Sequence, residues 1–185
     1  FGEGEFFTGG FSVRATIDEE MQEVAAESLR AQLEKYDRGR GIWHGTKARI
    51  AADLLTDEAS WRAALSDADI PRDVRLNGQW YPAVVLEVRD SDARIGIENV
   101  SDDEDGHWIT AKDVQWARKR RSDGTLAKKA RVAGDLLDVG DVVLVRRMTS
   151  DEDGSFIRWT LRQVSEVQGG FMAMDVNTGR VLAMQ

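Results

Sequence analysis

The sequence WYPAVVLEV at residues 80–88 opens the part of the chain that decides the fold. Four more short runs of apolar and polar residues follow turns that are rich in Asp, Ser or Gly; they lie at residues 94–97, 107–109, 142–147 and 156–164. Runs of this length between turn residues are typical of β-strands in small all-β domains. The sequence therefore predicts five strands between residues 79 and 165.

Five such strands fit a small barrel of the OB type. The predicted fold class is mainly β (α+β overall), because helical patterns precede the barrel and a hairpin pattern follows it. The hairpin occupies residues 171–184, with a turn at residues 176–179 that contains Asn177 and Gly179.

Before the barrel, apolar residues alternate over residues 11–17, which predicts a strand with one buried face. A helix should follow at once, since Asp18 is a good N-cap and apolar residues then recur every three or four positions until Gly39 and Gly41. If the barrel is an insertion, its two ends return to one place. We therefore expect residues 11–17 to lie near the C-terminal hairpin.

A second helix is predicted at residues 57–65, before Pro71. Thr56 could cap it. Trp61 and Leu65 are four residues apart on one helical face, so they should pack on whatever lies beneath.

Composition disfavours some classes of partner. The 185 residues carry a net charge of −8 with no basic half, and this charge repels a nucleic-acid backbone. There is no cysteine, and no apolar run approaches the length of a membrane span. The first residue is not Met and the last residues are apolar, which leads us to expect a piece of a longer chain.

One segment departs from the acidic composition. Residues 118–134 form a polar connection that we expect to be a mobile surface loop. Its candidate partner-binding residues are Arg118, Lys119, Arg120, Arg121, Lys128, Lys129 and Arg131, and Asp123 is the one acid among them. Such a cluster favours an acidic protein, an anionic glycan or lipid head groups as its partner, and a merely solvated loop is the alternative.

Other candidate sites are weaker. His44 and His107 are isolated in sequence, so no metal site or cofactor site is predicted. Two acidic turns match the start of a calcium loop but have Lys112 and Thr160 where its last ligand should be, which favours hairpin turns. The tryptophans admit a sugar-binding or partner-binding face, although Trp80, Trp108, Trp116 and Trp159 are expected to fill the core.

Several stretches together resemble one family. They are GFSVRATID at residues 10–18, YDR at 36–38, PAVVLEV at 82–88, WAR at 116–118, the pattern WxLxQVxEVQG at 159–169 and DxxTGRVLAM at 175–184. In this order they are similar to class A penicillin-binding proteins of the 1A type. That resemblance implies an interdomain linker at residues 1–77, an OB-like barrel at 78–166, and the first hairpin of a transpeptidase domain at 167–185.

The resemblance also implies a function. Members of this family are bifunctional synthases that polymerise and cross-link peptidoglycan, and this chain would be a non-catalytic regulatory or interaction domain of one. The family's serine transpeptidase uses Ser-x-x-Lys, Ser-x-Asn and Lys-Thr-Gly, none of which occurs here. The parent would be anchored in the inner membrane with this region on the periplasmic side.

The partner that the resemblance implies is a periplasmic or outer-membrane lipoprotein activator, with peptidoglycan itself as a further candidate contact. The alternative hypothesis is a free-standing OB domain that binds nucleic acid or glycan. Nucleic acid is disfavoured because residues 94–100 carry no aromatic and the next turn is acidic.

Overall fold

A computed structural model of the chain describes residues 14–71, 80–101 and 106–185. The chain divides into two compact units, one built from residues up to Leu29 together with Gly169–Gln185, and the other from Arg30–Gln168. The helices and strands are α2 (Glu19–Arg40), β1 (Ile42–Trp43), η1 (Ala52–Leu55), α3 (Glu58–Asp67), β2 (Trp80–Val88), β3 (Ala93–Ile97), β4 (His107–Ile109), α4 (Ala111–Val114), β5 (Arg118–Lys119), η2 (Ala133–Asp135), β6 (Val142–Thr149), β7 (Phe156–Arg162), β8 (Met172–Met174) and β9 (Val181–Met184).

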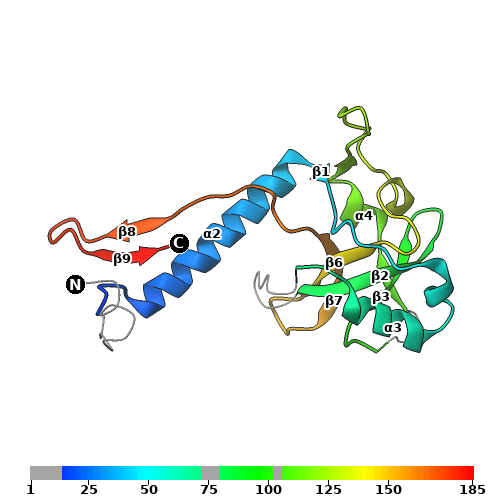
Figure 1. Cartoon of the computed structure of the whole chain (residues 1–185), viewed down its shortest axis with the longest axis horizontal. Helices are drawn as coiled ribbons and strands as arrows, with labels where there is room; N and C mark the ends of the chain where they lie inside the picture. Colours follow the sequence, from blue (N-terminus) through cyan, green and yellow to red (C-terminus); the bar gives the residue numbers. More distant parts are fainter. Residues whose placement is uncertain (1–13, 72–79, 102–105) are drawn as a thin grey trace, which may run out of the picture. The chain divides into compact units, whose positions relative to one another are not determined.

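Five antiparallel strands of the larger unit form a nearly closed barrel, as Figure 1 shows. Their order in the sheet is β4-β3-β2-β6-β7. The two edges approach each other, because Trp159 Nε1 on β7 donates a hydrogen bond of 3.3 Å to His107 Nδ1 on β4. The third barrel strand thus meets the fifth, as in an OB barrel. The predicted fold class and all five predicted strands are confirmed.

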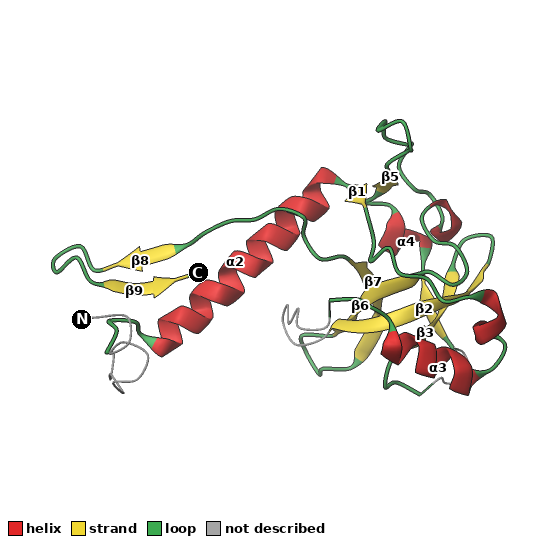
Figure 2. Cartoon of the chain, in the orientation of Figure 1, coloured by secondary structure: helices red, strands yellow, loops and turns green. Residues whose placement is uncertain are grey.

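The central strand β2 is buried on both faces. Its residues Ala83 and Val85 join the barrel core, whereas Val84 points to the other side and packs with Trp61 and Leu65 of α3. Figure 2 shows α3 against this side of the barrel. The predicted packing of Trp61 and Leu65 is therefore confirmed, and each of them covers part of the outer face of the sheet.

A glycine makes the contact between α3 and the sheet possible. Gly96 lies on β3 between two buried isoleucines, and a Cβ atom built there would come within 2.6 Å of the Trp61 ring. Such a distance is far below normal van der Waals contact. The missing side chain of Gly96 therefore lets the indole come close to this part of the sheet.

The start of α3 corrects one prediction. The N-cap is Asp57, whose side chain accepts a hydrogen bond of 2.9 Å from Ser60 N. Thr56 does not cap the helix. It follows the end of η1, and its hydroxyl donates to the carbonyl oxygen of Asp53 within η1. Asp57, one residue later, has the extended backbone that an N-cap requires, so its carboxylate caps the helix.

The smaller unit contains the start of α2 and the hairpin of β8 and β9. Asp18 caps α2 as predicted, because its Oδ1 accepts a hydrogen bond of 2.9 Å from Met21 N. The side-chain amide of Gln22 pairs with both backbone groups of Met184, at 2.8 and 2.9 Å. This amide satisfies an edge of β9 that would otherwise be open to pairing.

The strand predicted at residues 11–17 is only partly testable, because residues 11–13 lie outside the described residues. Residues 14–17 are not a strand, so that part of the prediction is wrong. The Thr16 hydroxyl donates to Val181 O and Asp18 N donates to Leu182 O. Two bonds do not make a β-ladder, but they confirm that this segment lies beside the hairpin.

Candidate functional site

The basic segment of residues 118–131 is folded back on itself as an irregular hairpin. Its first residues form β5, which pairs in parallel with β1. Arg121 N donates to Thr125 O, and Gly124 N donates to Arg121 O, which closes the tip. A bridge joins Arg120 to Leu126. We call residues 118–131 the basic hairpin; the sequence predicted a mobile surface loop here, and the structure gives it local backbone hydrogen bonds.

Three of the seven predicted site residues are bonded to the barrel unit, Lys119 through its side chain and Arg118 and Arg131 only through their backbones. Arg118 is partly buried in β5, and its Nε has no hydrogen-bond partner among the described residues. Lys119 Nζ lies 3.2 Å from Asp138 Oδ2. Arg131 donates its backbone N–H to Asp135, and this bond, together with one from Val132 N–H, lowers the pKa of the Asp135 carboxyl.

Four more cations have exposed side chains, and the Arg131 side chain is exposed as well. Arg120 and Arg121 make side-chain bonds only within the tip, to Gly124 O and to the Thr125 hydroxyl. Lys128 and Lys129 form no ion pair with any residue in the described part of the chain. Figure 1 shows the tip projecting from the barrel. The basic hairpin therefore presents five charges to solvent, which suits an anionic partner.

The acid within the basic hairpin has a structural role. Asp123 Oδ1 accepts hydrogen bonds from the Thr125 hydroxyl at 2.7 Å and from Thr125 N at 2.9 Å. These bonds lower the pKa of Asp123, so the carboxylate stays ionised and holds the tip turn. One acid at the tip does not neutralise the five exposed cations.

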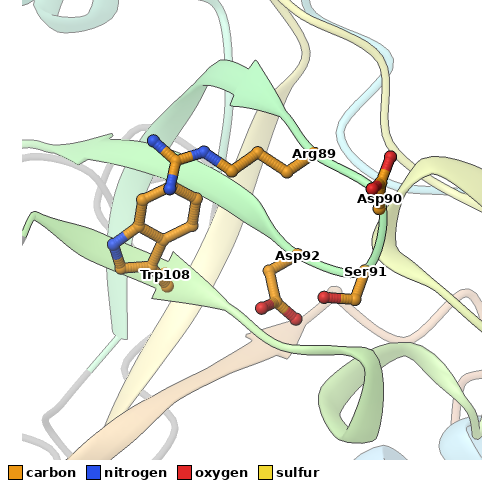
Figure 3. A pocket seen from close by; sticks show the side chains of 5 residues that line it. All are labelled: Arg89, Asp90, Ser91, Asp92 and Trp108. Atoms are coloured by element: carbon orange, nitrogen blue, oxygen red, sulfur yellow. The ribbon is translucent and has the colours of Figure 1, made fainter.

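A second surface feature is an open recess of about 620 Å³ at the turn between β2 and β3. Figure 3 shows the Arg89 guanidinium over the Trp108 indole, with Ser91 and Asp92 lining the recess and Asp90 pointing away from the indole. The guanidinium carbon is 4.2 Å from the ring centroid. Because Arg89 occupies one face of the indole, that face is not open for a sugar ring to stack on.

The recess is held by charge pairs. Glu87 binds Arg89 through both carboxylate oxygens, at 2.8 and 3.2 Å. The hydrogen bond from Arg89 lowers the pKa of Glu87, and the same bond raises the pKa of Arg89. Asp92 Oδ1 accepts from Ala111 N at the start of α4. These groups stabilise the turn.

The tryptophans divide into two groups. Trp159 is buried in the barrel core as predicted. Trp61, a residue of α3, is buried where that helix packs on the sheet. Trp80, Trp108 and Trp116 are only half-buried, so the prediction that they fill the core holds in part. Trp116 is covered instead by the Arg38 guanidinium at 4.4 Å, and burial lowers the pKa of Arg38 to about 10, which leaves it charged at neutral pH.

The two histidines take part in separate networks. His44 Nε2 lies 3.5 Å from Asp37 Oδ2 and its Nδ1 lies 3.8 Å from Glu166. His107 contacts Ser101 O and Trp159. Within residues 14–71, 80–101 and 106–185, no group of three His, Asp or Glu side chains is placed to hold a metal ion.

The two turns that resembled calcium loops can be placed only in part. Residues 102–105 of the first lie outside the described residues. The second is the turn between β6 and β7, where Asp153 Oδ1 accepts from Ser155 N at 3.0 Å. That bond contributes most to lowering the pKa of Asp153. The carboxylate thus stabilises a hairpin turn.

Comparison with known proteins gives a consistent result. The sequence model of the penicillin-binding protein OB-like domain matches residues 43–167. Penicillin-binding protein 1A of Rickettsia felis is 34% identical over 180 residues, which is 97% of this chain and 19% of that protein. Penicillin-binding protein 1A of Vibrio cholerae is 25% identical over 184 residues, covering 100% of this chain and 21% of that protein.

A solved structure agrees on the fold. The crystal structure of penicillin-binding protein 1A from Haemophilus influenzae matches with a TM-score of 0.61 at 19% identity, covering 100% of this chain and 23% of that chain. No helix in the described part of this chain is long and apolar enough to cross a membrane. The chain spans about a fifth of the length of the relatives it matches. It belongs to the class A penicillin-binding proteins of the 1A type, as their OB-like domain region.

Proposed function

We propose that this chain is a non-catalytic domain through which a partner protein regulates a bifunctional cell-wall synthase. The observation that carries the proposal is the family match over residues 43–167, in a chain that spans only 19% of the Rickettsia felis relative. The parent protein would polymerise and cross-link peptidoglycan elsewhere in its sequence.

The sequence supports a non-catalytic role for this segment. Ser-x-x-Lys, Ser-x-Asn and Lys-Thr-Gly do not occur in it, and these motifs supply the nucleophile, the base and the substrate-binding strand of a serine transpeptidase. A fluorescent penicillin is therefore expected to leave the purified chain unlabelled. Labelling at any serine would contradict the proposal directly.

The basic hairpin supports a role in binding. Five exposed cations in the basic hairpin attract an acidic surface even though the whole chain carries −8. An acidic face of a periplasmic or outer-membrane lipoprotein activator fits this charge, and anionic peptidoglycan is a further candidate. With either partner, the domain would lie on the periplasmic side of the inner membrane, where the synthase would be anchored.

The test compares the purified synthase with the synthase in cells. In one variant of the full-length protein, residues 43–167 are replaced by a short Gly/Ser linker; in a second, Arg120, Arg121, Lys128 and Lys129 are changed to Gln. Glycan polymerisation and cross-linking are measured with the purified enzymes, and peptide cross-linking is measured in cell walls.

If the domain is regulatory, both purified variants should polymerise and cross-link like the wild type. In cells, both variants should show reduced peptide cross-linking. If the linker variant loses activity when purified, the barrel supports catalysis structurally and the proposal fails. If cross-linking in cells equals that of the wild type with both variants, the domain does not regulate. The Gln variant guards against misfolding, because its four side chains are exposed.

A further inference from the structure

A second surface, away from the basic hairpin, has the composition of a protein-binding hot spot. It is a pocket of about 270 Å³ at the β4, β6 and β7 side of the barrel. Its lining residues are Tyr81, Val100, His107, Arg147, Phe156 and Trp159. They come from four barrel strands and the segment after β3, so no local stretch of sequence marks the pocket. We call it the aromatic pocket.

The walls of the aromatic pocket are held in place. Trp159 is buried, and it packs edge-on against Tyr81 at 5.4 Å and against His107 at 5.7 Å between ring centroids. His107 Nδ1 accepts from Trp159 Nε1, so the other ring nitrogen, Nε2, carries the proton and donates to Ser101 O at 3.0 Å. Both histidine nitrogens are thus occupied, and the pocket is preformed.

The rim of the aromatic pocket is apolar and unusually exposed. Phe156 is 47% exposed, although its ring lies 5.5 Å from that of Trp159. Its ring is therefore a large apolar surface left in water over the pocket, and such exposed apolar surface at a pocket is a feature of binding sites.

The rim also carries one cation. The Arg147 guanidinium lies 5.9 Å from the Phe156 ring and forms no ion pair with a residue in the described ranges. Aromatic residues and arginine together are the side chains most enriched at the centres of protein interfaces. A carboxylate next to an apolar side chain would complement this arrangement in charge and in shape.

We infer that the aromatic pocket binds a partner-protein segment that inserts one apolar or aromatic side chain and places a neighbouring Asp or Glu on Arg147. The inference rests on the proposed function, because it names the chemistry of the regulatory partner. The small volume suits one side chain. A glycan fits less well, because both histidine nitrogens are occupied and many sugar hydroxyls would remain unpaired.

The direct test is an NMR titration of the ¹⁵N-labelled 185-residue chain with capped dipeptides. The probes are acetyl-Glu-Phe-amide, acetyl-Gln-Phe-amide and acetyl-Glu-Ala-amide, with chitotriose as the glycan probe. We expect Glu-Phe to shift the Trp159 indole N–H resonance saturably, in the millimolar range of a small ligand. Gln-Phe should bind about threefold to fivefold more weakly, as an exposed ion pair predicts, and Glu-Ala should not saturate.

Variants separate charge from apolar contact. Arg147→Gln should remove the difference between Glu-Phe and Gln-Phe, whereas Arg147→Lys should keep it; Phe156→Ala should weaken both probes alike. Lys112→Gln, at an exposed position of α4, is the matched control and should bind like the wild type. The inference is overturned if Glu-Phe gives no saturable shift, if Arg147→Gln leaves the probe difference intact, or if chitotriose saturates the same resonance at equal or lower concentration.

The same variants in the full-length synthase distinguish the two proposals. If replacing residues 43–167 lowers cross-linking in cells but Arg147→Gln combined with Phe156→Ala does not, the pocket inference fails while the proposed function stands. If the dipeptides bind as expected and the barrel replacement changes nothing in cells, the proposed function fails. A loss of cross-linking with the pocket variant supports both.

Discussion

The two compact units differ in how far their large apolar side chains are buried. In the unit Arg30–Gln168, strand residues such as Ile95, Val145 and Leu161 are fully buried inside the barrel. In the unit that contains the hairpin, Met172 is 58% exposed and Met184 is 63% exposed. The barrel therefore gains most of its stability from burial, at about 25 cal/mol for each Å² of apolar surface removed from water.

The hairpin depends on other interactions. A two-stranded hairpin is marginally stable in water by itself. Here the Gln22 amide and the backbone of Asp18 add hydrogen bonds to β9. The barrel unit thus carries its own core, whereas in the described part of the hairpin unit polar contacts from the start of α2 stabilise β9.

Truncation of apolar residues should change the free energy of unfolding most strongly, and differently in the two units. Leu161→Ala removes a fully buried side chain and should lower the free energy of unfolding by about 2–5 kcal/mol. Met172→Ala removes an exposed side chain and should change it by less than about 0.5 kcal/mol. Urea unfolding followed by tryptophan fluorescence measures both, and equal effects would mean that the hairpin methionines are as important as the core.

Gly96→Ala tests whether α3 needs close contact with the sheet. Because the added Cβ would meet the Trp61 ring at 2.6 Å, we expect a loss of about 1–3 kcal/mol in the free energy of unfolding. In a Trp61→Ala background the same change should cost less, since the clashing ring is gone. Additive costs would show that Gly96 serves some purpose other than accommodating the indole.

Gln22→Ala should affect the hairpin unit and leave the barrel unchanged. It removes two hydrogen bonds to Met184, with an expected local cost of about 1 kcal/mol. Amide hydrogen exchange should become faster at Met184 and should stay unchanged in β2 and β6. Gln22→Glu is the control, because it keeps an acceptor for Met184 N but loses the donor.

The smallest effect concerns pH. Hydrogen bonds from Ser60 lower the pKa of Asp57 in the folded chain, so its capping contribution is present above its unfolded pKa of about 3.9 and disappears as the pH falls through the lower folded pKa. Asp57→Ala should therefore destabilise the barrel unit at pH 7 and less so at pH 2–3. Asp175→Ala is the control in the hairpin turn, and it should not alter the barrel transition at either pH.

Local patterns predicted much of the fold. The alternation in residues 80–88 and in the four later runs located all five barrel strands, and Asp18 marked the start of α2. Errors arose where two residues could serve one role, as with Thr56 and Asp57 at α3, or where a strand-like pattern lacked a partner to pair with, as at residues 14–17. Periodicity shows which face of a strand is buried but not which strand lies beside it.

For the candidate sites, the cations of the basic hairpin could be identified from the sequence, because they are neighbours in the chain. The fold was needed to show that Lys119 pairs with Asp138 and which of the other cations are exposed. The aromatic pocket was decided entirely by the fold, since barrel closure brings Tyr81, His107 and Trp159 together from three different strands. Charge clusters are visible in sequence because they are local, whereas a pocket depends on long-range pairing that only strand order fixes.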